Sequence, residues 1–193
     1  MKKEIELKFC PVNKDEIRKK LSVAGFKMIT PEFLMHRITF ANPNLTDRWG
    51  RVRQEANKIT MAIKRVVDKN TIDGTEEIEV VVPSVDIGVS FMAAVGFFPK
   101  SNQENYREIW QKNDVEATLD TWPGLPTMIE IESLNTDNDI TENIYATIDA
   151  LGFDKKNAQF GSIDLVYENV LNIPWKYICE LPEITFANPP KKI

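Results

Sequence analysis

Histidine and cysteine are scarce in this chain, and long apolar runs are absent from it. The single histidine, His36, cannot build a histidine-based metal site, and we interpret it as an ordinary strand residue. Cys10 and Cys179 lie far apart and match no metal-ligand spacing, so we expect reduced, partly buried thiols. No apolar run approaches the ~20 residues that cross a bilayer, and the charged start leads into no signal-peptide core. We therefore expect a cytoplasmic protein without a membrane partner.

The balance of charge limits the partners further. The chain has 24 Lys and Arg against 29 Asp and Glu, and the net charge of −5 argues against a general nucleic-acid binder. A local cationic pocket inside an acidic protein is still compatible with this balance. The length of 193 residues predicts one domain, over residues 1–170, and a proline-containing tail over 171–193 that we expect to be irregular.

Alternating apolar residues and turn signals predict about eight strands and three or four helices. Capping residues and glycines delimit helices from Asn13 to Gly25, from Ser84 to Gly96 and from Ile140 to Gly152. Extended runs are predicted near 4–9, 33–42, 50–56, 59–67, 76–82, 104–112, 115–121 and 128–132. Because turns such as Asp73-Gly74 join neighbouring strands directly, we predict an α+β fold with a largely antiparallel sheet.

The first predicted strand, Glu4-Ile5-Glu6-Leu7-Lys8-Phe9, has one charged and one apolar face. Side chains alternate across a strand, so Glu4, Glu6 and Lys8 point the same way. They are close enough together to hold a divalent cation and to touch an anion attached to it. Taken alone, the pattern also fits the solvated face of an ordinary amphipathic strand. The remaining strands decide between these interpretations.

The same design recurs along the chain, with the signs of charge segregated strand by strand. Carboxylates pair at period two as Glu4/Glu6, Glu77/Glu79 and Glu130/Glu132, whereas other strands carry the cations Arg51, Arg53, Lys64 and Arg107. A solvated face is expected to mix the signs, so the segregation favours a closed or nearly closed barrel with a charged lumen. Unpaired buried ions are costly, so these residues pair with one another or hold a ligand. A polyphosphate with a divalent metal satisfies both signs at once.

The ordered series of charged residues resembles the CYTH superfamily, also called triphosphate tunnel metalloenzymes. A single Glu-x-Glu-x-Lys is weakly specific, but the whole series, which runs from residue 4 to about 168, is strongly so. It reads Glu4-x-Glu6-x-Lys8, Arg51-x-Arg53, Thr60-x-x-x-Lys64, Glu77-x-Glu79, Arg107, Asp120 and Glu130-x-Glu132. The family includes class IV adenylyl cyclases, thiamine triphosphatases and inorganic triphosphatases. The resemblance implies an eight-stranded, largely antiparallel closed β-tunnel with flanking helices.

The resemblance also implies roles for individual residues. Metal ligands for Mg²⁺ or Mn²⁺ would be Glu4, Glu6, Asp120, Glu130 and Glu132. Phosphate oxygens would be bound by Lys8, Arg51, Arg53, Lys64 and Arg107. The candidate catalytic residues are Glu77, Glu79 and Lys8, with the two glutamates holding a second metal or orienting water.

Three departures from the family pattern affect the choice of substrate. Asn105-Tyr106-Arg107 stands where many members have Lys-x-Arg, which leaves one cation fewer. Phe160-Gly161-Ser162 stands where some triphosphatases have a late lysine. The strand that contains Arg37 corresponds less clearly to the family, because Ile38, Thr39 and Phe40 replace acidic and aromatic residues.

Three functions are compatible with this sequence. The first is metal-dependent hydrolysis of inorganic triphosphate, thiamine triphosphate or a nucleoside triphosphate, with water attacking in line. The second is a class IV adenylyl cyclase, in which the 3′-hydroxyl of ATP attacks its α-phosphorus to give cyclic AMP and pyrophosphate. The third is a noncatalytic module that binds polyphosphate or a nucleotide. We expect hydrolysis, as the more general outcome, by a monomer or homodimer.

Overall fold

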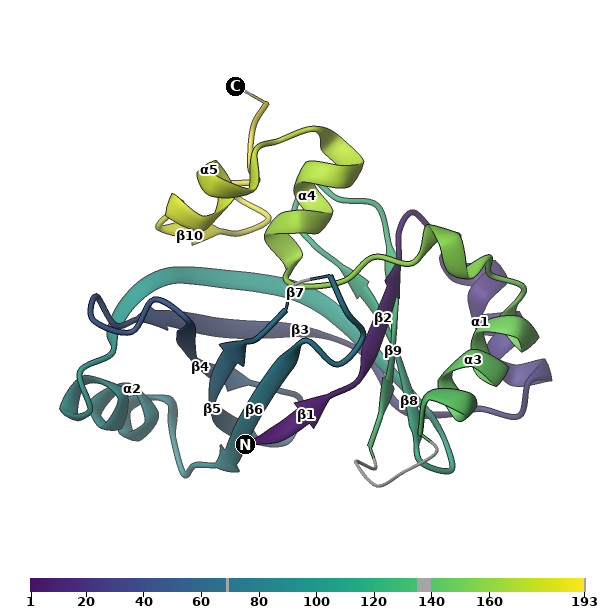
Figure 1. Cartoon of the computed structure of the whole chain (residues 1–193), viewed down its shortest axis with the longest axis horizontal. Coiled ribbons are helices and arrows are strands. Elements are labelled where there is room, and N and C mark those ends of the chain that lie inside the picture. The colour runs from purple at the N-terminus through teal and green to yellow at the C-terminus, as the bar shows by residue number, and fades with distance from the viewer. Residues whose placement is uncertain (69, 135–139, 193) are drawn as a thin grey trace.

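One large sheet dominates the structure, a computed structural model that describes residues 1–68, 70–134 and 140–192. Figure 1 shows the sheet with helices at its two sides and above it. The elements within these ranges are β1 (Lys2–Glu4), β2 (Glu6–Phe9), α1 (Lys14–Val23), β3 (Lys27–Ala41), β4 (Arg48–Gln54), β5 (Ile59–Val66), β6 (Thr75–Val81), α2 (Val85–Ala94), β7 (Phe98–Lys112), β8 (Val115–Thr121), β9 (Met128–Ser133), α3 (Ile140–Leu151), the 3₁₀ helix η1 (Lys155–Asn157), α4 (Ile163–Leu171), α5 (Trp175–Glu180) and β10 (Glu183–Ile184).

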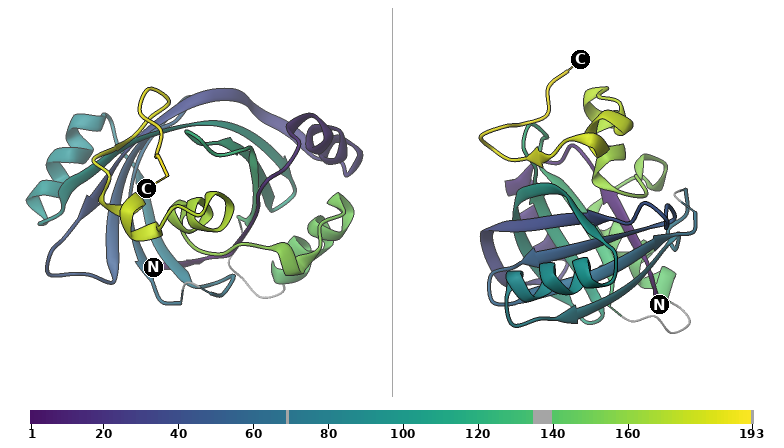
Figure 2. Two further views of the ribbon diagram at one scale, coloured as in Figure 1. Left: turned by 90° about the horizontal axis from the view of Figure 1, so that it is seen from above. Right: turned by 90° about the vertical axis from the view of Figure 1, so that its left-hand side faces the viewer.

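The N-terminal segment joins the two ends of this sheet. The strands follow the spatial order β1-β6-β5-β4-β3-β7-β8-β9-β2. Only Ile5 separates β1 from β2, and β1 pairs with β6 whereas β2 pairs with β9. The carbonyl of Ile5 also accepts a hydrogen bond from the backbone amide of Ser133 at 3.0 Å. The sheet is therefore a nearly closed barrel, whose ring is visible from above in Figure 2.

The predicted α+β fold with a largely antiparallel tunnel is confirmed, but the predicted count of eight strands is too low. The described ring contains nine strands, because the N-terminal strand is interrupted at Ile5. A tenth strand, β10, pairs with β7 in parallel. Strands β3 and β7 are each 15 residues long and begin earlier than predicted. Their added lengths contain Pro31 and Pro99, which lie at register shifts of the β3–β7 pairing, where a missing N–H is tolerated.

Helices cover the outside of the barrel on two opposite sides. Helices α1 and α3 pack over β2, β8 and β9, around fully buried residues such as Leu21 and Ile131. Helix α2 packs on the other side against Val52 and Phe40. A Cβ at Gly88 would lie 3.0 Å from the side chain of Val52, so this glycine lets α2 approach the sheet closely. The strands beneath these helices direct their charged faces into the lumen, as does β6, although Ile78 and Val80 on its outer face are exposed.

The C-terminal segment forms a cap over one mouth of the barrel. We use the word cap for residues 161–192, which contain α4, α5 and β10 and lie above the ring in Figures 1 and 2. The expectation of an irregular stretch over 171–193 is wrong for α5 and β10, because Ile178 and Ile184 are buried and anchor them despite the nearby prolines. The hydroxyl of Tyr167 donates a hydrogen bond to the carbonyl of Pro123 at 2.6 Å. The predicted single domain over 1–170 stays a prediction.

Among the helices described, none combines the length and the apolar character that crossing a membrane requires.

Candidate active site

The lumen of the barrel contains a cavity of about 980 Å³ that is open to solvent and lined by both signs of charge. Alternation along each strand produces this lining: Arg51 and Arg53 face the cavity while Val52 between them packs under α2. The structure brings together every residue that the sequence predicted for the site. These are Glu4, Glu6, Lys8, Arg51, Arg53, Lys64, Glu77, Glu79, Arg107, Asp120, Glu130 and Glu132.

Three carboxylates gather where β2 meets β9. Glu6 pairs directly with Glu132, and Lys8 pairs with Glu130. One carboxylate oxygen from each of Glu6, Glu130 and Glu132 lies within 4.8 Å of the other two. We call these three residues the acidic cluster. Close to it, Oε2 of Glu4 is buried and has no hydrogen-bond partner in the described part of the chain. Hard oxygen donors at this density fit a divalent cation such as Mg²⁺ or Mn²⁺.

Burial and mutual repulsion distort the protonation of the acidic cluster. Burial, followed by the charges of Glu4 and Glu130, raises the pKa of Glu132 to about 8. Burial and the Glu130 charge likewise raise the pKa of Glu6 well above its usual value. Burial also opposes ionisation of Glu130, but Lys8 and a hydrogen bond with Glu6 outweigh it and hold the pKa of Glu130 well below its usual value. With a pKa of about 8, Glu132 retains its proton at neutral pH, and a bound cation would displace it.

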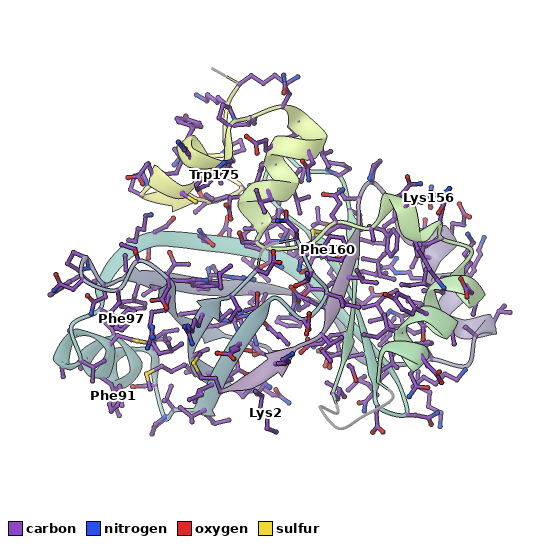
Figure 3. The ribbon with its side chains drawn as sticks, viewed as in Figure 1. Lys2, Phe91, Phe97, Lys156, Phe160 and Trp175 are labelled. Atoms are coloured by element: carbon purple, nitrogen blue, oxygen red, sulfur yellow. The ribbon has the colours of Figure 1, made fainter. Side chains whose placement is uncertain are left out.

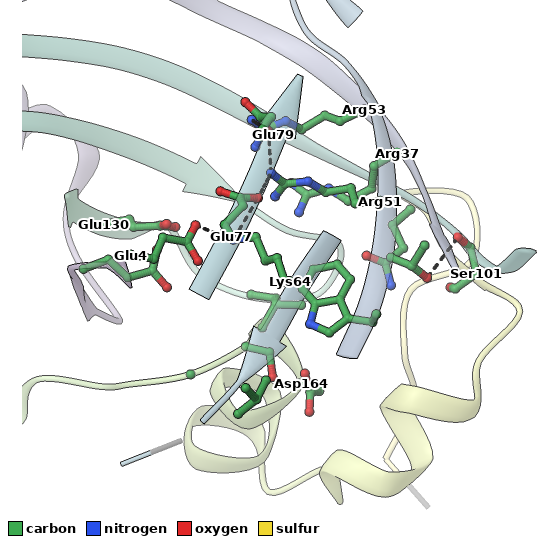
Figure 4. A pocket seen from close by; sticks show the side chains of 18 of the residues that line it. Glu4, Arg37, Arg51, Arg53, Lys64, Glu77, Glu79, Ser101, Glu130 and Asp164 are labelled. Carbon is green, nitrogen blue, oxygen red and sulfur yellow. Dashed lines mark hydrogen bonds and ion pairs between the residues drawn. The ribbon is translucent and has the colours of Figure 1, made fainter. Parts of the chain in front are cut away.

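On the facing wall, cations from β4 and β5 pair with the carboxylates of β6, as Figure 4 shows. Nη2 of Arg51 lies 3.0 Å from Glu77 and 2.8 Å from Glu79. Nη2 of Arg53 lies 3.2 Å from Glu79. Nζ of Lys64 forms a close ion pair with Glu4 and lies 3.6 Å from Glu77.

Two further side chains, Glu55 and Thr60, belong to this network. Glu55, just beyond the end of β4, forms an ion pair with Arg53 at 2.7 Å. The hydroxyl of Thr60 donates a hydrogen bond to Glu79 at 3.2 Å. Thr60 stands at a position of the family series, whereas Glu55 is outside the series but continues the period-two alternation of Arg51 and Arg53, a signal that could have identified it. Glu79 therefore accepts from two arginines and a threonine, and these contacts fix its position.

Arg107 and Asp120 face each other across β7 and β8 as a bidentate pair. Nε of Arg107 lies 2.8 Å from one oxygen of Asp120, and Nη2 lies 2.5 Å from the other. Nη2 is also 3.5 Å from Glu130. Both oxygens of Asp120 are therefore engaged by a guanidinium, and Asp120 is not part of the acidic cluster in the described part of the chain.

Arg37 is a lumen residue to which the sequence analysis assigned no role. Its Nη2 donates to Oδ1 of the fully buried Asn105 at 2.7 Å, and its guanidinium carbon lies 4.5 Å from the centre of the Trp122 ring. The position of the missing family cation is thus filled by an amide that contacts an arginine from β3. The strand register places Arg37 in the lumen, because Arg37 pairs with Arg53 and lies on the same face of the sheet as Arg53.

The cap closes one side of the cavity. Asp164, Trp175 and Ile178 are among its lining residues, and Figure 3 shows Trp175 above the barrel mouth. Gly161 and Ser162, at the position of the late lysine in some triphosphatases, also line the cavity.

The fold and the lumen define a class of protein with an antiparallel β-barrel whose interior is lined by carboxylates and cations. The model of the CYTH domain matches residues 2–157, and the chain belongs to this family. A protein of Methanocaldococcus jannaschii named "putative adenylate cyclase" is 26% identical over 162 residues, which are 80% of this chain and 92% of that protein.

Solved structures agree with the assignment of the fold. A Vibrio parahaemolyticus protein described as a "putative adenylate cyclase" superposes with a TM-score of 0.71 at 16% identity, over 89% of this chain and 98% of that one. A protein of Pyrococcus horikoshii superposes with a TM-score of 0.65 at 27% identity, over 86% of this chain and 99% of that one.

Proposed function

We propose that this protein is a metal-dependent phosphohydrolase that acts on a triphosphate-containing substrate inside the lumen. The proposal rests on the presence of a carboxylate cluster and a set of cations in one cavity. The acidic cluster offers oxygen ligands within 4.8 Å of one another, and five cations of the predicted site line the same space. A chain of phosphates with an associated divalent cation is complementary to both sets.

The cations would bind the phosphate oxygens. Nε of Arg51 and Nε of Arg53 are buried without a hydrogen-bond partner among the described residues, so each guanidinium has a donor free for a ligand. Three further cations are paired with carboxylates, namely Lys8, Lys64 and Arg107. When phosphate enters, each would bind phosphate oxygens in addition to its carboxylate or in place of it. Because Asp120 engages Arg107 through both oxygens, we propose that Asp120 positions this arginine.

Glu6, Glu130 and Glu132 would hold the divalent cation, with Glu4 adding its unpaired Oε2. When bound, Mg²⁺ or Mn²⁺ supplies positive charge that stabilises the phosphoryl group during transfer. Lys8 lies beside this cluster, in contact with Glu6, and would stabilise the same developing charge.

Glu77 is the better candidate of the two β6 glutamates for receiving a proton from the attacking water. Burial raises the pKa of Glu77 above its usual value, which moves it toward the range of an effective general base. Arg53 and Arg51 instead outweigh burial at Glu79 and lower its pKa. We therefore propose that Glu77 orients and deprotonates water, whereas Glu79 holds the two arginines in place.

Adenylyl cyclase activity is the second candidate, and the names of the Methanocaldococcus and Vibrio relatives favour it. The same cations would bind ATP, and the reacting phosphorus would be the α-phosphorus. The two activities therefore differ in products rather than in the groups that line the cavity.

Product analysis tests both candidates. The purified chain is incubated with inorganic triphosphate, thiamine triphosphate or ATP, with Mg²⁺, Mn²⁺ or EDTA, and phosphate, cyclic AMP and pyrophosphate are quantified. Phosphate that appears only with metal supports hydrolysis, and cyclic AMP with pyrophosphate supports cyclisation. Glu77→Gln should abolish turnover, while Glu76→Gln is the matched control, because Glu76 is on the same strand and pairs with Arg65 outside the cavity. Tight binding without any product would contradict both enzyme candidates and favour a binding module.

A further inference from the structure

One guanidinium of the lumen lacks the carboxylate partner that its neighbours have. Arg51, Arg53 and Arg107 each form ion pairs with acidic side chains. Arg37 forms no ion pair within 4.0 Å in the described ranges, and its Nε is buried with no hydrogen-bond partner there. Its contacts are the Asn105 carbonyl oxygen and the Trp122 ring. Arg37 thus lines the cavity as a cation without a carboxylate partner in the described ranges, and its buried Nε is an unused donor.

A second unused donor lies on the neighbouring strand. Ser101, on β7, is 5% exposed, and its Oγ is buried with no partner among the residues described. Thr39 pairs with Ser101, and Arg37 pairs with Gln103, so Arg37 and Ser101 are diagonal neighbours on one face of adjacent strands. Diagonal side chains of this kind are about 7–8 Å apart at the backbone, a span that one phosphoryl group can bridge. Figure 4 shows both residues at the edge of the same pocket.

This pair lies on the cap side of the lumen. Trp122, under the Arg37 guanidinium, belongs to the buried cluster that holds the cap, together with Val166 and Tyr167. The residue after Ser101, Asn102, donates its backbone amide to the carbonyl of Pro182 at 2.9 Å and pairs with β10. The acidic cluster instead lies where β2 meets β9. A ligand that touches both regions would extend across the cavity.

The electrostatic surroundings of Arg37 favour an anion. Burial, followed by the charges of Arg51, Arg53 and Arg107, lowers the pKa of Arg37 well below its usual value. Asp120 opposes this effect, but both of its oxygens are engaged by Arg107. Of these four guanidiniums, Arg51, Arg53 and Arg107 have carboxylate partners, whereas Arg37 has none within the described ranges. An anion that enters there would relieve this repulsion.

We propose that Arg37 and Ser101 form a phosphoryl-binding subsite at the cap side of the lumen, in which Arg37 Nε and Ser101 Oγ donate hydrogen bonds to one phosphoryl group. Asn105 and Trp122 hold the guanidinium in position for this contact. The subsite deepens the proposed function, on which it rests for the identity of the ligand: it takes one phosphoryl group of the triphosphate or a free orthophosphate.

Calorimetric titration in EDTA tests the subsite, because binding is then measured without turnover. Inorganic triphosphate and orthophosphate are titrated separately into the wild type, Arg37→Gln, Ser101→Ala and the double variant. Arg65→Gln is the matched control, since it removes one positive charge from a strand of the same barrel at a side chain that does not line the cavity.

We expect Arg37→Gln to weaken triphosphate binding roughly 10- to 100-fold, the loss typical of a hydrogen bond to a charged group. Ser101→Ala should weaken it roughly two- to tenfold. If both donors bind the same phosphoryl group, the double variant should lose less than the product of the two single losses. Unchanged affinity in both single variants, or the same loss in Arg65→Gln as in Arg37→Gln, would overturn the proposal. If orthophosphate and triphosphate affinities fall together in the variants, the subsite binds free phosphate. If only the triphosphate affinity falls, the subsite binds one phosphoryl group of the triphosphate.

Thermal unfolding separates ligand binding from a structural role. Because Arg37 is a buried cation without a counter-ion, the ligand-free Arg37→Gln variant should have a Tm equal to or above that of the wild type, with a smaller increase on adding triphosphate. A lower ligand-free Tm with an unchanged triphosphate-induced increase would show that Arg37 only supports the fold. The two proposals can fail separately: triphosphate hydrolysis with unchanged affinity in Arg37→Gln refutes the subsite alone, and reduced affinity in a protein that turns over no substrate refutes hydrolysis alone.

Discussion

Glu6 and Glu132 are direct cross-strand partners on β2 and β9, and both carboxylates point into the lumen beside Glu130. Like charges placed opposite each other destabilise a strand pair, yet this pair closes the barrel. The cost is reduced because burial and nearby carboxylates raise the pKa of both side chains, that of Glu132 to about 8, which favours their uncharged forms. Four predictions follow from this arrangement and from the contacts around it.

Binding of a divalent cation should release protons and strengthen as pH rises. Metal ligands bind as carboxylates, and the pKa of Glu132 is about 8 in the metal-free protein. Affinity for Mn²⁺ or Mg²⁺ should therefore increase up to about pH 8 and then level off. Titration calorimetry in buffers with different ionisation enthalpies measures the number of protons released. Zero release at pH 7 would contradict the assignment of the acidic cluster as the metal site.

Stability of the metal-free protein should fall as pH rises through the same range. The folded pKa of Glu132 lies above the unfolded value, so between about 4.5 and about 8 the folded state retains a proton that the unfolded state releases. In Glu132→Gln this contribution disappears, and the decline in the free energy of unfolding should be shallower. Urea unfolding in EDTA at several pH values measures the slope, with Glu76→Gln as the control outside the cavity.

Replacement of Arg53 by alanine should weaken triphosphate binding while leaving the fold intact. Arg53 lines the cavity, and its Nε has no hydrogen-bond partner among the described residues, so the substitution would remove about 1.5–3 kcal/mol of charge-assisted hydrogen bonding to the ligand. KM or the dissociation constant should rise roughly tenfold or more. Arg65→Ala, on the neighbouring strand and outside the cavity lining, should change neither value. Equal effects of the two substitutions would point to net charge rather than direct contact.

The cap should depend on its buried apolar contacts with the barrel. Ile178 is 2% exposed, and its replacement by alanine should reduce the free energy of unfolding by about 2–5 kcal/mol, or release the cap locally. Hydrogen exchange of the α4 and α5 amides distinguishes the two results. Ile87→Ala is the control, because Ile87 is 52% exposed on α2 and its loss should cost about 0.5 kcal/mol or less. Protection of the cap amides that is unchanged in Ile178→Ala would refute the anchoring role.

Period-two patterns in the sequence were sufficient to predict the lumen. Glu77 and Glu79 alternate with Ile78 and Val80, and this alternation alone determines which side chains share a face. The ion-pair and hydrogen-bond partners of these side chains could not be predicted from the sequence, because they depend on strand register. The pairing of Arg37 with Arg53 and of Thr39 with Arg51 is set by contacts between distant segments.

Prolines account for two secondary-structure elements that the sequence analysis placed wrongly, the start of β7 and helix α5. Pro99 obscured the first part of β7, and with it Ser101, because proline usually argues against a strand interior. Pro174 similarly suggested an irregular tail, although proline immediately before a helix is compatible with its first turn.

The pairing of β2, which follows the interruption at Ile5, with β9 affects the order in which the barrel folds. Glu6 and Lys8 belong to β2, while their partners Glu130 and Glu132 belong to a strand that the chain reaches more than a hundred residues later. These contacts have very high sequence separation, so their formation requires the intervening strands to be in register and is expected to come late in folding. Uptake of a divalent cation would then report on completion of the barrel, because in a partly folded chain Glu6 does not yet face Glu130 and Glu132.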